Sequence, residues 1–101
     1  MTLAVRLHAN AQRDFYRIQA YYDAEAPDQT GRFIAEFFAA AGRLAEFPHS
    51  GPELRGGTRR ANLHVFPYLL WYRVDDEAEE VEIIAVLHHR QDSAEFDGRL
   101  L

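Results

Sequence analysis

The chain changes the period of its hydrophobic residues near its midpoint, and this change constrains the fold more than any other feature. Between residues 11 and 44, apolar residues recur three and four positions apart, which is the spacing of one face of an α-helix. After residue 60, alternation and dense apolar runs replace that spacing. We therefore predict an α+β domain of two layers: an N-terminal strand, an antiparallel helical hairpin, a three-stranded antiparallel meander and a short C-terminal tail.

The first half of the chain predicts two helices joined by a very short connection, which favours an antiparallel hairpin. Asn10 is a suitable N-cap for the first helix, and Pro27 is expected to stop it. Asp28 is expected to cap the second helix, which ends in the turn-forming sequence of residues 48–52. The two core-facing stripes consist of Ala11, Phe15, Ile18 and Tyr22, and of Ile34, Phe37, Ala41 and Leu44, the second widened by Phe33 and Phe38.

The strands are read from short apolar or alternating runs. An edge strand is expected at Val5 to His8, and the meander strands are expected at residues 61–65, 68–74 and 81–88. The acidic segment from Asp75 to Glu80 is expected to be the loop of the last hairpin.

That loop predicts the register of the last hairpin, in which Val74 faces Val81 and Arg73 faces Glu82. One face of the sheet then packs on the helices and consists of Tyr68, Leu70, Tyr72, Val74, Val81, Ile83, Ala85 and Leu87. The opposite face carries an apolar patch consisting of Leu69, Trp71, Ile84 and Val86. Such a patch is either a partner site or is covered by the tail that follows Asp92.

Composition limits the classes of function. The 101 residues suffice for one domain, which we place at residues 1–101. The chain has no cysteine and no run of the roughly 20 apolar residues that a membrane helix needs. Its N-terminus lacks the order of a signal peptide, so we expect a cytoplasmic protein without a membrane partner. The net charge of -5 weighs against direct, sequence-specific nucleic-acid binding.

No local motif predicts a catalytic, metal or cofactor site. The adjacent His88 and His89 would point to opposite faces of a strand, and no second ligand stands at metal-binding spacing. A phosphate-binding glycine loop and a Ser-His-Asp arrangement are also missing. The basic residues are all arginines, and six of them lie in the second half: Arg55, Arg59, Arg60, Arg73, Arg90 and Arg99. They form either an anion-binding surface or an ordinary solvated face.

The order of several motifs resembles a known toxin family. The motifs are Tyr21-Tyr22, the turn at Pro48 and Gly51, Gly57-x-Arg59, the segment Phe66-Pro67-Tyr68-Leu69-Leu70-Trp71-Tyr72-Arg73-Val74, and Ile83-Ile84-Ala85-Val86-Leu87-His88-His89-Arg90-Gln91-Asp92. Together they resemble the ParE branch of the RelE/ParE toxin superfamily, over nearly the whole chain. The resemblance implies a toxin that inhibits DNA gyrase by binding and forms a hetero-oligomer with a ParD-like antitoxin.

The same resemblance separates two mechanisms. In RelE-like nucleases a catalytic arginine follows the tyrosine that matches Tyr68, and here that position is Leu69. A catalytic tyrosine of the tail is matched by Phe96, whereas a further arginine of the nuclease site is matched by Arg90. Cleavage of RNA needs an acid, a base and a cation, so these replacements argue against an enzyme. The alternatives are a ribosome-dependent mRNA endonuclease using Arg90 with His88 or His89, and a decayed, non-toxic interaction domain.

Three surfaces are expected to serve the antitoxin or the target. These are the exposed sheet face around Leu69 and Trp71, the outer flank of the hairpin at Tyr21, Phe33 and Phe38, and a charged surface with Arg59, Arg73, His88 and Arg90. We expect an acidic, amphipathic antitoxin segment to fold onto them.

Overall fold

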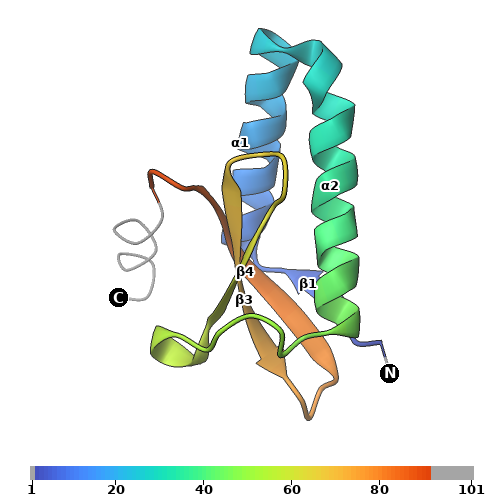
Figure 1. Ribbon diagram of the computed structural model, residues 1–101, viewed down its shortest axis with the longest axis vertical. Coiled ribbons are helices and arrows are strands. Elements are labelled where there is room, and N and C mark those ends of the chain that lie inside the picture. Colours follow the sequence, from blue (N-terminus) through green and yellow to red (C-terminus); the bar gives the residue numbers. More distant parts are fainter. Residues whose placement is uncertain (1, 92–101) are drawn as a thin grey trace.

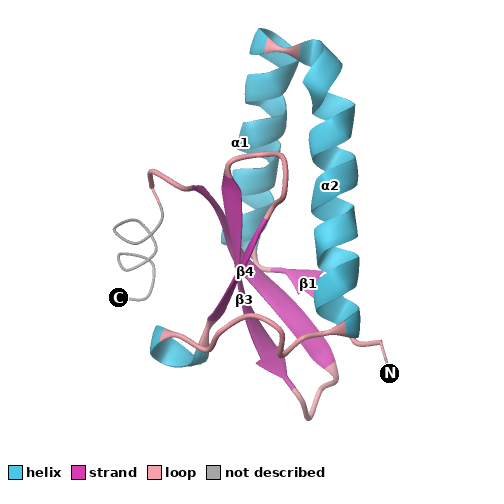
Figure 2. Cartoon of the chain, viewed as in Figure 1, coloured by secondary structure: helices cyan, strands magenta, loops and turns pink. Residues whose placement is uncertain are grey.

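The structure, a computed structural model, describes residues 2–91 and has two layers (Figure 1). The helical layer is a hairpin of α1 (Ala9–Glu25) and α2 (Pro27–Glu46). The second layer is a four-stranded sheet in the order β1-β4-β3-β2 (Figure 2). Its strands are β1 (Ala4–Leu7), β2 (Arg59–Asn62), β3 (Tyr68–Asp75) and β4 (Glu80–His88), and a short 3-10 helix, η1 (Arg55–Gly57), precedes β2. The predicted α+β architecture is therefore confirmed.

β1 is the edge strand that the sequence predicts, and its place in the sheet is now defined. It runs parallel to β4, with Ala4 opposite Glu80 and Leu7 opposite Ile83. β4 thus lies in the centre of the sheet, between β1 and the antiparallel β3. This pairing joins the two ends of the described chain and brings the start of α1 beside the end of β4.

The helix boundaries differ from the predicted ones by a few residues. His8, and not Asn10, caps α1: its Nδ1 accepts a hydrogen bond from the Asn10 N–H at 3.0 Å. Pro27 opens α2 as well as following α1, and only Ala26 separates the two helices. Proline suits a first helical turn because its missing N–H would have had no helical partner there. Asp28 is not the N-cap of α2, contrary to our prediction, but lies in its first turn. Its negative charge there interacts favourably with the positive end of the helix dipole.

The register of the last hairpin is confirmed at its loop end and changes farther along. Arg73 faces Glu82 and Val74 faces Val81, as predicted. A β-bulge then places Trp71 opposite Ala85 while Tyr72 stays opposite Ile83, so Ile84 is an extra residue in β4. An extra residue reverses the direction of every side chain that follows it.

The bulge overturns three predicted positions. Ala85 and Leu87, which we expected on the helix side, belong to a cluster on the opposite face with Trp71 and Ile84. Val86, which we expected on the open face, lies fully buried in the main core beneath the helices. The largest buried side chains of that core include Phe33, Phe37, Leu70, Tyr72, Val81 and Ile83.

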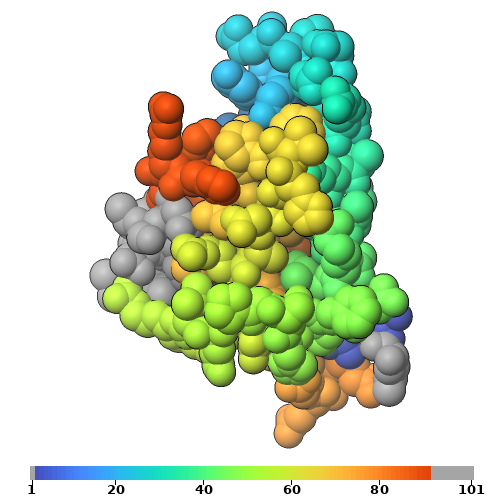
Figure 3. Space-filling model, in the orientation of Figure 1, coloured from blue at the N-terminus to red at the C-terminus, as the bar shows by residue number. Residues whose placement is uncertain are grey.

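The predicted apolar patch on the open face is not exposed. Leu69 and Trp71 each have an exposed fraction of 6%, and Ile84 has 8%. Leu54, which lies in the connection between α2 and β2, packs against the cluster of Trp71, Ile84, Ala85 and Leu87. The Arg60 guanidinium lies 5.5 Å from the centre of the Trp71 ring. Figure 3 shows this connection, in green, crossing the face of the sheet turned away from the helices. The tail after Asp92, our predicted alternative cover, lies outside the described residues.

β2 begins two residues earlier and ends three residues earlier than the alternation from Ala61 to Val65 predicts. It ends at Asn62, and the Val65 side chain is 72% exposed. The carboxylate of Glu36 in α2 accepts hydrogen bonds from the backbone N–H groups of His64, Val65 and Phe66, at 2.7, 2.6 and 3.4 Å. These amides therefore bind a helix side chain and do not extend the strand.

Candidate functional site

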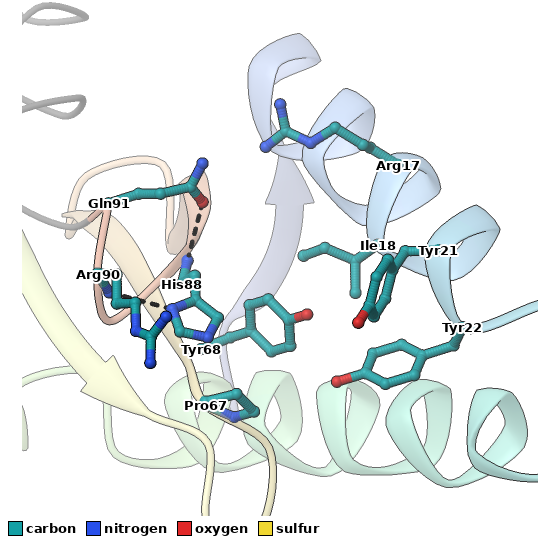
Figure 4. A pocket seen from close by; sticks show the side chains of 9 residues that line it. All are labelled: Arg17, Ile18, Tyr21, Tyr22, Pro67, Tyr68, His88, Arg90 and Gln91. Carbon is teal, nitrogen blue, oxygen red and sulfur yellow. Dashed lines mark hydrogen bonds between the residues drawn. The ribbon is translucent and has the colours of Figure 1, made fainter. Parts of the chain in front are cut away.

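A pocket of about 550 Å³ lies where α1 meets the end of β4 and the start of β3 (Figure 4). It is lined by Arg17, Ile18, Tyr21, Tyr22, Pro67, Tyr68, His88, Arg90 and Gln91. Its size falls in the range of sites that hold small ligands or single side chains. The pocket combines apolar walls with cationic and hydroxyl groups, and we treat it as the candidate functional site.

Three tyrosines supply the hydroxyl groups of the pocket. Figure 4 shows the hydroxyls of Tyr21 and Tyr22, from α1, and of Tyr68, from β3, pointing toward one another. Tyr68 is buried, with an exposed fraction of 7%. This burial, together with the nearby Tyr22 side chain, raises the pKa of Tyr68 far above its usual value. Tyr68 therefore stays neutral and can donate its proton in a hydrogen bond to a bound oxygen.

Packing behind the pocket holds these rings in place. Tyr22 stacks on Phe33 with the ring centres 5.8 Å apart and meets Phe66 edge-on at 5.5 Å. Tyr68 meets both Phe33 and His88 at 5.6 Å between ring centres. Tyr21 is 57% exposed and forms part of the rim. The inner rings are thus anchored in the core, whereas Tyr21 remains accessible.

Two arginines bring positive charge to the pocket from different elements. Arg17 precedes Tyr21 by four residues, so the two lie on one side of α1. Its guanidinium pairs with the Asp14 carboxylate at 3.3 Å and its side chain is 58% exposed. Arg90 follows β4, and its backbone N–H donates to His88 Nδ1 at 3.1 Å. The backbone N–H of His88 in turn donates to the Gln91 side chain at 3.4 Å.

The groups that line the pocket can bind an oxyanion. Its lining residues include no carboxylate. Tyr68 keeps its proton, and the Nδ1 atom of His88 is already engaged by the Arg90 backbone. Phenol O–H groups and guanidinium N–H groups are donors that bind carboxylate or phosphate oxygens. Recognition of an anion is therefore the chemistry that this arrangement supports best.

The structure gathers three of the predicted site residues at this pocket: Tyr21, His88 and Arg90. It also brings in Arg17, Tyr22 and Tyr68, which our site prediction omitted. The spacing of Arg17 and Tyr21 along α1 was a usable signal for one of them. Tyr68 had no such signal, because its approach to α1 depends on the pairing of the strands.

Two further predicted residues lie on other exposed surfaces. Phe38 is 61% exposed on α2 and, with Tyr16 of α1, contacts Phe15; we call Tyr16 and Phe38 the hairpin flank. Arg73 is exposed on β3, and although it faces Glu82, the Glu82 carboxylate makes its ion pair with Arg6 at 3.2 Å.

The remaining predicted residues have structural roles or are buried. Phe33 is completely buried, so its predicted place on the outer flank is wrong. Leu69 and Trp71 are buried on the sheet, as described above. The Arg59 side chain is 18% exposed and donates to the Gly51 carbonyl at 2.6 Å, which ties the turn after α2 to β2.

Residues 2–91 contain neither a membrane-spanning helix nor a cluster of metal ligands. No helix in this part of the chain is long and apolar enough to cross a membrane. Histidine and carboxylate side chains are nowhere grouped in threes, as a site for a metal ion would require, within the same residues.

Comparison with known families gives a match over most of the chain. A family model described as the ParE toxin of the type II toxin–antitoxin system parDE matches residues 5–93. The putative toxin Y4kP of Sinorhizobium fredii is 35% identical over 88 residues, covering 86% of this chain and 88% of the relative. Toxin ParE2 of Mycobacterium tuberculosis is 33% identical over 104 residues, covering 98% of this chain and 97% of the relative.

Two solved structures are similar in fold. A chain from the chromosomal ParDE system of P. aeruginosa superposes with a TM-score of 0.71 at 16% identity, covering 86% of this chain and 96% of the other. A chain from the toxin–antitoxin complex RelBE2 of Mycobacterium tuberculosis superposes with a TM-score of 0.63 at 29% identity, covering 88% and 100%. The hairpin-and-sheet architecture is thus shared with chains from both a ParDE system and a RelBE2 complex.

Proposed function

This chain belongs to the ParE toxin family of type II toxin–antitoxin systems, and from that premise we propose that it acts by binding DNA gyrase and not by cleaving RNA. We further propose that a ParD-like antitoxin neutralises it in a hetero-oligomeric complex. Both partners would be met in the cytoplasm.

The observation that carries this proposal is the state of Leu69. In RelE-like nucleases we expect a catalytic arginine at the position of Leu69. In this chain the position holds an aliphatic side chain, and Leu69 has an exposed fraction of only 6%. A buried leucine can neither stabilise the charge of a transferring phosphate nor move a proton. The second replaced position, Phe96, lies outside the described residues.

The hairpin flank supports the proposal of an antitoxin partner. Tyr16 is 60% and Phe38 61% exposed, and both rest on the core residue Phe15. Exposed aromatic side chains are typical of partner surfaces, and an amphipathic helix is the element that best covers a helical flank. The two similar structures come from a ParDE system and from a RelBE2 toxin–antitoxin complex.

Controlled expression in a bacterial host tests the proposal. We expect induction to stop growth and to activate a DNA-damage reporter while protein synthesis continues at first. Co-expression of the cognate antitoxin should restore growth. Arrest of translation without a DNA-damage response would contradict gyrase inhibition, and normal growth would indicate a decayed, non-toxic member.

One observation favours the nuclease as the second candidate function. Arg90, His88 and Tyr68 lie in a single pocket, so a cation, an imidazole and a phenol are close together. A ribosome-dependent nuclease using this group should cleave messenger RNA at codon-phased positions. Such cleavage by the wild type, lost in His88→Ala, would replace our proposal with this one.

A further inference from the structure

We propose that the pocket between α1 and the end of β4 anchors an acidic side chain of a peptide partner, with an apolar neighbour of that side chain against its walls. In taking the antitoxin as the source of this peptide, the inference rests on the proposed function. The surface is distinct from the hairpin flank, since neither Tyr16 nor Phe38 lines the pocket.

The walls of the pocket are suited to an apolar group. Ile18, with an exposed fraction of 6%, Pro67 and the ring of Tyr68 provide the carbon surface, and the ring of Tyr22 completes it. A volume of about 550 Å³ is more than one carboxylate fills. It accommodates an acidic side chain together with an aliphatic residue beside it.

The hydroxyl groups are suited to an oxygen acceptor. The three phenol oxygens point toward a common region of the pocket in Figure 4. Each hydroxyl can donate one hydrogen bond to an acceptor placed in that region. Because its raised pKa keeps the Tyr68 phenol neutral, this group does not repel a bound carboxylate.

The charge around the pocket differs from that of the chain as a whole. The sequence has 16 acidic and 11 basic residues, yet the lining residues contain Arg17 and Arg90 and no acid. Arg17 already binds Asp14, but a guanidinium has five N–H donors and retains some for a ligand. For the Arg90 guanidinium, residues 2–91 provide no ion pair. This local excess of positive charge complements a carboxylate.

A peptide carboxylate fits these features better than a nucleotide does. A phosphate monoester brings a charge of about -1.5 to -2, and nucleic-acid sites are generally rich in cations. This chain carries a net charge of -5 and offers the pocket two arginines. A single carboxylate with an aliphatic neighbour matches both the two cations and the carbon walls.

An NMR titration of the isotope-labelled chain tests the inference without any antitoxin. The probes are the blocked pentapeptide acetyl-Ala-Leu-Glu-Leu-Ala-amide and the same peptide with Gln in place of Glu. We expect the Glu peptide to bind about tenfold more tightly, with signal shifts at Tyr22, Tyr68 and Arg90, because charge-assisted hydrogen bonds are the stronger ones. Arg90→Gln should remove the preference, and Arg43→Gln, an exposed arginine in the last turn of α2, should leave it unchanged.

A second pair of variants tests the hydroxyl groups. Tyr68→Phe keeps the ring and should weaken binding of the Glu peptide severalfold. Tyr72→Phe removes a hydroxyl that lies outside the pocket and contacts the Gly51 N–H, and it should leave the affinity for the Glu peptide unchanged. Equal affinity for the Glu and Gln peptides would overturn the inference. So would tighter binding of adenosine monophosphate or inorganic phosphate at the same residues, which would assign the pocket to phosphate groups. If the wild-type chain is not toxic in the host assay, the proposed function is refuted, but the outcome of the peptide titration is unaffected.

Discussion

The carboxylate of Asp14 accepts a hydrogen bond from the backbone N–H of Val86 at 2.9 Å, across 72 positions of sequence. β1 ends opposite Ile83, so among residues 2–91 no strand pairs with β4 on that side beyond this point. Asp14, with an exposed fraction of 2%, takes the place of the missing strand partner. Its other oxygen holds Arg17 at 3.3 Å, so the same residue joins the sheet to the rim of the pocket.

Asp14→Ala should therefore destabilise the protein. It leaves the Val86 N–H buried without an acceptor, and an unsatisfied buried donor costs about 1–3 kcal/mol. Urea unfolding followed by circular dichroism measures the change, and Asp14→Asn, which keeps an acceptor oxygen, should lose less. Equal losses of unfolding free energy in Asp14→Ala and Asp14→Asn would show that the hydrogen bond from the Val86 N–H is not the cause of the destabilisation.

Gly51 should not tolerate a side chain. A Cβ atom there would lie 2.7 Å from both the Arg60 carbonyl oxygen and the Tyr72 hydroxyl, which also accepts the Gly51 N–H at 3.1 Å. Gly51→Ala should lower the thermal midpoint. Gly31→Ala and Gly42→Ala are matched controls in α2, because a Cβ atom at either position would have no neighbouring atom within 4 Å. Each should raise the free energy of unfolding by about 0.5–1 kcal/mol. A lower midpoint for Gly31→Ala than for Gly51→Ala would contradict the account.

Glu36 should control the loop that follows β2. Its carboxylate binds three consecutive backbone amides, so Glu36→Ala should expose the amides of His64, Val65 and Phe66 to exchange. Hydrogen exchange measured by NMR should show these amides becoming faster while those of β4 stay protected. Glu46→Ala, at the end of α2, is the control and should leave all three rates unchanged.

Tyr68 predicts how stability depends on alkaline pH. Burial raises its pKa above the usual value of 10.0, so the folded protein holds this proton more tightly than the unfolded chain does. Its contribution to stability is complete below pH 10 and declines as the pH rises beyond that value toward the pKa of the folded state. Tyr68→Phe should show a smaller loss of stability between pH 10 and 11 than Tyr16→Phe. Identical pH profiles would exclude Tyr68 as the cause.

The last hairpin shows how far the sequence predicts this fold. Its acidic loop correctly predicted the pairs Arg73–Glu82 and Val74–Val81. The bulge at Ile84 was missed because residues 83–87 are all apolar, and an unbroken apolar run carries no alternation from which an extra residue could be recognised. The sheet faces of Ala85, Val86 and Leu87 were therefore assigned wrongly.

The candidate site was predictable only in part, for a related reason. Tyr21, His88 and Arg90 were expected to contact partners, but as parts of separate surfaces. They share one pocket because β1 pairs with β4 and sets α1 beside the end of β4. That long-range pairing has no local signal in the sequence, so Tyr68 could not be assigned to the site, whereas the four-residue spacing to Tyr21 was a usable signal for Arg17.

Inhibition of purified gyrase tests the central claim most directly. Supercoiling of relaxed plasmid DNA by gyrase and ATP is measured with increasing amounts of the purified chain, alone and with its antitoxin. We predict that the chain inhibits supercoiling in proportion to its concentration, that the antitoxin reverses the inhibition, and that messenger RNA on translating ribosomes stays intact at the same concentrations. Full supercoiling activity at a large excess of the chain, accompanied by codon-phased cleavage of messenger RNA, would contradict the account.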